Sequence, residues 1–281
     1  MPIADTAALV EDAVRRSAAV GSFNVITLEH IEAVIDAGER LRRPVIIQVS
    51  QNAVRFHSGQ LTPIAHAAAA AADLASVPVA LHLDHVTDSA LLHQAKAAGF
   101  SSAMFDAGAE PYTVNVAATR AAVDWAHENG LWLEAELGYI GGKPDSPVSA
   151  HAEGARTDPD EAVAFVAATG VDALAVAVGS SHAMLSQTAT LDLQLIASLA
   201  QAVPVPLVLH GSSGVSDEVL TSAVRAGIRK VNVGTALNIG FTQAVREKLA
   251  SDPALVDPRR YLEIARSRAS DAVAAALRAL G

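Results

Sequence analysis

The sequence predicts a single-domain α/β protein whose fold is a (β/α)8 TIM barrel spanning residues 1–281. Three observations point to this fold. The length of 281 residues suits one such barrel. Short runs rich in Val, Ile and Leu alternate with longer segments of helical period, and there are eight of these runs. No Pro-, Ser- or Gly-rich linker divides the chain. An open doubly wound sheet is the alternative, because its parallel strands are also buried on both faces and equally apolar.

Each predicted strand is a short apolar run. In chain order the strands are VGSFNV (20–25), PVIIQVS (44–50), VPVALHLDH (77–85), SSAMFDA (101–107), LWLEAELG (131–138), DALAVAVG (172–179), VPLVLHG (205–211) and KVNVG (230–234). The segments between them mostly have the length of a crossover helix, as at 29–43, 112–130 and 216–228. Glycines stand where such helices would end, at Gly99, Gly130, Gly170 and Gly227. Eight strand-then-helix units favour the barrel over the open sheet.

The longest irregular stretch follows the fifth strand and is rich in Gly and Pro. It reads GGKPDSPVSAHAEGARTDP, residues 141–159. Long loops of this kind are often active-site lids, so the sequence predicts a mobile active-site loop at about 139–159. A tolerated surface insertion is the alternative.

Composition limits the function classes. The formal net charge is -10, which disfavours nonspecific binding to nucleic acid. The chain has no cysteine, so any zinc would be held by His and carboxylates. The N-terminus shows no secretory signal, and the apolar run 65–80 is interrupted by His66 and Asp73. We therefore expect a soluble cytoplasmic protein with no nucleic-acid or membrane partner.

Histidines stand at the ends of three predicted strands. His85, His182 and His210 follow the third, sixth and seventh strands at equivalent heights. A single histidine there is more often a hydrogen-bonded structural residue than a metal ligand. Barrel closure can bring three together, and three neutral imidazoles with an open fourth position make a catalytic zinc site.

Asp84 is a candidate acid/base beside this metal. It precedes His85 on the same strand, so the two side chains should diverge unless the strand ends and twists there. Capping of the next helix is the alternative role for Asp84. His82 shares the face of Asp84 and could support the site or belong to the core.

Two Gly-rich segments favour a phosphorylated ligand. HGSSG (210–214) and VNVGT (231–235) follow the seventh and eighth strands, where barrels of this type commonly bind phosphate. A Schiff-base mechanism needs a desolvated lysine on a barrel strand. We expect Lys230 at the start of the eighth strand, on the opposite end of the barrel, and none of the other lysines is better placed. This favours metal chemistry.

The sequence resembles the class II, zinc-dependent ketose-bisphosphate aldolases, nearest to the tagatose- and fructose-bisphosphate branch. The resemblance rests on SFNVITLEH, ALHLDHVTD, LEAELGYIGG, LAVAVGSSHAM, PLVLHGSSG and KVNVGT, and it runs nearly end to end, through DPRRYL at 257–262. It implies reversible cleavage of a phosphorylated ketose, fructose 1,6-bisphosphate or tagatose 1,6-bisphosphate, to dihydroxyacetone phosphate and an aldehyde.

The resemblance also implies roles for individual residues. His85, His182 and His210 would hold Zn2+, with Glu136 and Asp106 close to the metal, and Asp84 would act on the C4 hydroxyl. Substrate and phosphate positions would be Asn24, Ser50, Ala183, Gly211, Ser213, Asn232, Gly234 and Thr235. Arg259 would reach the second phosphate across a subunit interface, which implies a homodimer or homotetramer. A monovalent cation, Na+ or K+, is typical near the phosphate site.

Two positions depart from the family pattern. Ala183 stands where the family usually has Gly directly after a zinc histidine. Pro144 occupies the position of a loop glutamate assigned to proton transfer, and Asp145 is the residue that could substitute for it. These changes motivate an alternative: a metal-binding sugar-phosphate barrel with an altered substrate or lost turnover. A metal-dependent hydrolase or isomerase on the same scaffold is a third reading.

Overall fold

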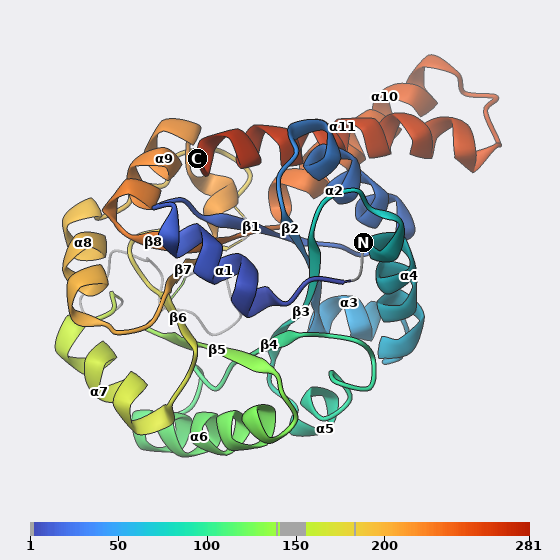
Figure 1. Ribbon diagram of the computed structural model, residues 1–281. Helices are drawn as coiled ribbons and strands as arrows, with labels where there is room; N and C mark the ends of the chain where they lie inside the picture. Colours follow the sequence, from blue (N-terminus) through green and yellow to red (C-terminus); the bar gives the residue numbers. More distant parts are fainter. Residues whose placement is uncertain (1–2, 139, 141–155, 183) are drawn as a thin grey trace.

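The computed structural model describes residues 3–138, 140, 156–182 and 184–281 (Figure 1). Eight parallel strands close into a barrel in the order β1 to β8, and β8 pairs with β1. The strands are β1 Val20–Asn24, β2 Val45–Ser50, β3 Val79–Val86, β4 Ser102–Phe105, β5 Trp132–Leu137, β6 Ala173–Val176, β7 Leu207–Leu209 and β8 Ile228–Val233. The predicted barrel is confirmed, and the pairing of the first and last strands excludes the open sheet.

Helices surround the barrel on its outside, except α1, which crosses one opening of the barrel (Figure 1). They are α1 Thr6–Arg15, α2 Leu28–Leu41, α3 Gln51–Phe56, α4 Leu61–Leu74, α5 Ser89–Leu92, α6 Tyr112–Glu128, α7 Pro159–Thr169, α8 Leu193–Ala202, α9 Asp217–Ala226, α10 Thr235–Ser251 and α11 Pro258–Ala279, with a 3-10 turn η1 at Ser212–Gly214. Within the described part of the chain, no helix combines the length and apolarity needed to cross a membrane.

Local chemistry explains where these helices begin and end. Asp158 caps α7 by accepting hydrogen bonds from the backbone N–H groups of Asp160 and Glu161. Gly170 ends the same helix in the left-handed conformation, at φ 73°, which glycine adopts without a Cβ penalty. Such caps fix the length of each crossover and so the height of each strand end.

The apolar core lies mainly between the barrel wall and the surrounding helices. Outward-facing strand residues such as Ile47, Leu81 and Leu133 are fully buried in it. A smaller cluster forms where Leu9 and Val10 of α1 pack on the N-terminal ends of the strands, and α1 crosses that opening of the barrel (Figure 1). The N-terminal end is thus covered, and a binding site is left to the C-terminal end.

Helices α10 and α11 form a hairpin that projects away from the barrel (Figure 1). Arg259 lies in the first turn of α11, and its side chain is 89% exposed and paired with Asp257. Most of the predicted active-site loop, residues 139 and 141–155, lies outside the described residues.

Candidate metal centre and active site

A cavity of about 300 Å³ opens among the C-terminal ends of the strands. Its lining residues are Asn24, Val25, Ile26, Gln48, Ser50, Asn52, Asp84, His85, His182, Gly211, Ser212, Ser213, Asn232, Gly234, Thr235 and Asn238. Segments far apart in sequence therefore converge on one pocket, at the end of the barrel where enzymes of this fold place their chemistry.

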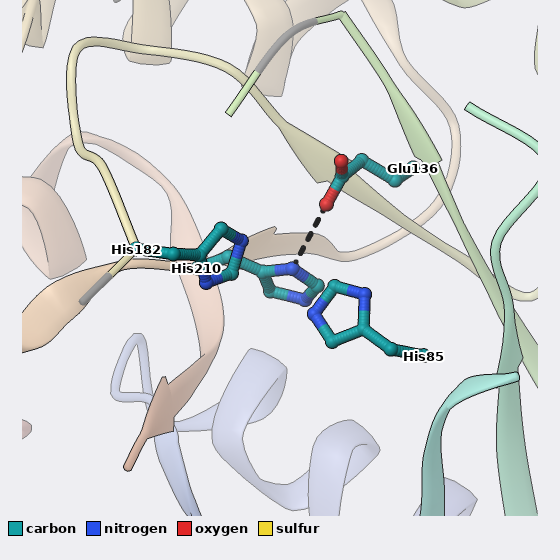
Figure 2. Close-up of side chains that lie close together, drawn as sticks. All are labelled: His85, Glu136, His182 and His210. Atoms are coloured by element: carbon teal, nitrogen blue, oxygen red, sulfur yellow. Dashed lines mark hydrogen bonds and ion pairs between the residues drawn. The ribbon is translucent and has the colours of Figure 1, made fainter. Parts of the chain in front are cut away.

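Three imidazoles and one carboxylate meet beside this cavity. His85, Glu136, His182 and His210 each offer a ligand atom, and these atoms all lie within 4.8 Å of one another (Figure 2). They come from β3, β5, the segment after β6 and the end of β7. Nitrogen and oxygen donors at this spacing fit a divalent ion such as zinc, and three histidines leave room for a substrate ligand.

His85 reaches the cluster through an irregularity in β3. Its φ is 48°, a left-handed value that a residue with a Cβ rarely adopts, and the register with β4 shifts between Leu83 and Val86. The shift lets His85 and Asp84 point into the same pocket, with His85 Nε2 4.0 Å from Asp84 Oδ1. This resolves how two adjacent strand residues serve one site.

Asp106 lies on the outer side of His85. Its Oδ2 is 2.9 Å from His85 Nδ1, so the carboxylate holds the ring with Nε2 turned toward the cluster. Asp106 is not among the four residues whose ligand atoms converge. The structure thus places it one contact away from the candidate metal position.

His210 is fully buried between two glutamates. Its Nδ1 lies 3.0 Å from Glu136 Oε2, and its Nε2 lies 2.9 Å from Glu134 Oε1. Burial alone would lower the pKa of His210, but the hydrogen bonds to Glu134 and Glu136 outweigh it and raise the pKa to about 9. Without a metal, His210 therefore holds a proton that a metal ion would displace.

A lysine lies under the site, against our expectation. The sequence predicts Lys230 at the start of its strand, at the opposite end of the barrel; instead β8 begins at Ile228 and Lys230 is fully buried inside the barrel. Its Nζ donates to Glu134 Oε2 at 2.9 Å and to Asn232 Oδ1 at 2.6 Å. Sequence reasoning gave neither Glu134 nor Lys230 a role in the site, although each shares a strand face, at two-residue spacing, with a residue to which it gave one.

Asp84 ends a chain of buried hydrogen bonds. Ser22 donates to Gln48, the Gln48 amide donates to Asn24, and Asn24 Nδ2 donates to Asp84 Oδ2 at 3.1 Å. The second oxygen, Oδ1, is buried without a hydrogen-bond partner among the described residues. Burial would raise the pKa of Asp84, but the neighbouring histidines, His85 first, outweigh it and lower the pKa. Asp84 is therefore a buried carboxylate with one oxygen hydrogen-bonded to Asn24 and the other without a hydrogen-bond partner among the described residues.

His82 belongs to the barrel interior below Asp84. Its Nδ1 lies 2.8 Å from Ser102 Oγ, and the ring is fully buried. Burial, aided by the charge of Lys230, lowers the pKa of His82 to about 3, so the ring is neutral.

The Gly-rich segments lie against the pocket as small, close-packed turns. A Cβ on Gly211 would stand 2.7 Å from the backbone of Ser181, and one on Gly234 would stand 3.1 Å from Asn24 Oδ1. Ser213 Oγ accepts from the backbone N–H of Ala236 in α10. Such turns admit an anion close to backbone N–H groups.

Most predicted site residues converge. The cavity is lined by Asn24, Ser50, Asp84, His85, His182, Gly211, Ser213, Asn232, Gly234 and Thr235. Arg259 does not line it and lies on the projecting hairpin. Ala183 and Asp145 lie outside the described residues.

Comparisons with known proteins agree with this geometry. The family model for class II fructose-bisphosphate aldolase matches residues 4–281. A fructose-bisphosphate aldolase from Staphylococcus aureus is 36% identical over 283 residues, covering 100% of this chain and 98% of that protein. The YdjI aldolase structure from Escherichia coli K12 superimposes with a TM-score of 0.83 at 32% identity, covering 99% of this chain and 97% of that one. The fructose-bisphosphate aldolase of Campylobacter jejuni, 23% identical with a TM-score of 0.83 over 99% and 95% of the two chains, shares the fold.

Proposed function

The chain belongs to the class II fructose-bisphosphate aldolase family, whose members are lyases, and from this premise we propose a zinc-dependent aldol cleavage of a phosphorylated ketose. The substrate would be fructose 1,6-bisphosphate or tagatose 1,6-bisphosphate, and the products dihydroxyacetone phosphate and an aldehyde such as glyceraldehyde 3-phosphate. One observation carries the proposal. Asp84 Oδ1 lies 4.0 Å from His85 Nε2 and both residues line the cavity, so a base and a candidate metal ligand share one pocket.

Zinc held by His85, His182 and His210 would supply electrophilic polarisation of the ketose C2 carbonyl. Asp84 takes the proton of the C4 hydroxyl through Oδ1, because its lowered pKa keeps it ionised and Asn24 holds its other oxygen. C4 becomes the aldehyde carbon as the C3–C4 bond breaks, and the electron pair of that bond passes toward the C2 carbonyl. A proton delivered to C3, for which Asp145 is the candidate donor, completes dihydroxyacetone phosphate. In condensation the same carboxyl group returns the proton.

The remaining assignments extend the proposal to the phosphates. Gly211, Ser213, Gly234 and Thr235 would bind the donor phosphate, with Na+ or K+ nearby. Arg259 is exposed on the projecting hairpin and would serve the pocket of another subunit in a homodimer or homotetramer. We place the enzyme in the cytoplasm, as its proposed substrates suggest.

The test measures dihydroxyacetone phosphate release from the two bisphosphates by zinc-loaded and by chelator-treated protein. Release that requires the metal supports the proposal and ranks the two C4 epimers. No release from either compound, with zinc still bound, would overturn it and favour the barrel with altered substrate or lost turnover that Pro144 and Ala183 motivate.

A further inference from the structure

Lys230, which lies beneath the pocket, fixes the orientation of the Asn232 side-chain amide. Asn232 Oδ1 is 2.6 Å from Lys230 Nζ. A lysine ammonium group only donates hydrogen bonds, so the atom that faces it must be the amide oxygen. The NH2 group must then point to the other side.

That NH2 group is buried, in a residue that lines the cavity. Asn232 is 7% exposed and lines the cavity, and its Nδ2 has no hydrogen-bond partner among the described residues. A buried donor is costly to leave unsatisfied. Such a donor, fixed in advance, is what stabilises an oxygen that gains negative charge during a reaction.

Lys230 can hold this arrangement because it is anchored twice. Its second bond, to Glu134, joins two buried and oppositely charged groups that are both fully excluded from solvent. Glu134 in turn contacts His210 Nε2 through its other oxygen. Lys230 itself does not line the cavity, so any effect on a ligand must pass through its neighbours.

We propose that Lys230 is a positioning residue that locks the Asn232 amide with its NH2 group toward the substrate. The identity of the substrate atom rests on the proposed function, where it is an oxygen of the dihydroxyacetone phosphate half that becomes negatively charged. The lock itself is a property of the barrel interior and needs no substrate.

Removing Lys230 from the wild-type protein would leave the Glu134 carboxylate buried without its partner, so the comparison is made in a Glu134→Gln background, where Lys230 keeps Asn232 Oδ1 as an acceptor. Glu134→Gln alone keeps the Lys230–Asn232 bond and serves as the reference. Lys230→Met in the Glu134→Gln background removes the donor to Asn232 without leaving a buried carboxylate, while the introduced glutamine amide can still accept from His210. Lys230→Gln in the same background restores a donor and serves as the rescue.

In kinetics we expect the Lys230→Met/Glu134→Gln protein to lose about tenfold or more in kcat relative to Glu134→Gln, with equal zinc content. Lys230→Gln should recover most of that loss. Adding Asn232→Ala should lower kcat strongly in the Glu134→Gln protein and only slightly in the Lys230→Met/Glu134→Gln protein. Losses that simply multiply would overturn the proposal, because Lys230 would then act by another route.

A second readout needs no turnover. The Asn232 side-chain amide, assigned in 15N spectra by its loss in Asn232→Ala, should be rigid in the ligand-free wild-type protein and mobile in the Lys230→Met pair. A mobile amide in wild type would overturn the lock even if none of the Lys230 variants folds. A rigid amide in an enzyme that cleaves neither bisphosphate would uphold the lock while the proposed function fails.

Discussion

Replacing Gly211 with alanine should weaken metal binding from a distance. Gly211 has a φ of 67°, where alanine costs about 1–2 kcal/mol. Its new Cβ would also stand 2.7 Å from backbone atoms of Ser181, which must retreat by about 0.7 Å to reach the 3.4 Å of an ordinary contact. His182 is the next residue, and metal–ligand distances tolerate only about 0.2 Å. We therefore expect zinc affinity to fall about 10–100-fold.

Zinc competition against a chromogenic chelator measures this, with urea unfolding in parallel. Gly59→Ala is the matched control, because Gly59 has a φ of 74° and a Cβ added there would meet no atom within 4 Å. It should cost a similar 1–2 kcal/mol, roughly, in the free energy of unfolding and leave zinc affinity unchanged. Wild-type zinc affinity in Gly211→Ala would show that the Ser181 backbone does not transmit the strain to His182.

Four further outcomes follow from the site. Asp84→Asn should keep zinc and lose about 10²–10⁴-fold in turnover; near-normal activity would remove Asp84 from the mechanism. His210→Ala should lose zinc, and full retention would refute its role as a ligand. Because the metal-free protein raises the pKa of His210 to about 9, zinc affinity should fall about tenfold per pH unit below that value, and a flat profile from pH 9 to 7 would contradict this. The pKa of His82 in the folded protein, about 3, lies below its unfolded value, so the contribution of neutral His82 to the free energy of unfolding is fully present above pH 6.5 and is lost as the pH falls toward 3. Between pH 6.5 and 5, urea unfolding should show that the wild type loses about 2 kcal/mol more of this free energy than His82→Gln.

The fold was predictable because strands of a closed parallel barrel are buried on both faces. Their apolar runs are continuous, so even short strands such as β7, Leu207–Leu209, were found. Strand ends were harder to predict. The sequence predicted that the eighth strand begins at Lys230, two residues after the true start of β8 at Ile228, and only the closed barrel shows that this lysine meets Glu134 of β5.

The candidate ligands were predictable for the same reason, since each lies in the last residues of a strand or in the segment that follows it. The bulge at His85 was not, because nothing in the sequence marks a left-handed histidine. The orientations of amides were also beyond the sequence. Gln48 and Asn24 form a directed chain toward Asp84 only when β1, β2 and β3 lie side by side, with Asn24 opposite Gln48 in the register.

The pairing of β8 with β1 sets the moment at which the site can first exist. During synthesis His85 and Asp84 leave the ribosome long before Ile228, and until β8 arrives the growing sheet has an open edge at β1. Glu134 lacks the Lys230 ammonium group beside it, and Asn232 is not yet made. A chain that ends before β8 would therefore contain all three histidines but lack Lys230 and Asn232, which lie beneath the site. Stable metal binding would then begin only after β8 has been synthesised and has paired with β1 to close the barrel.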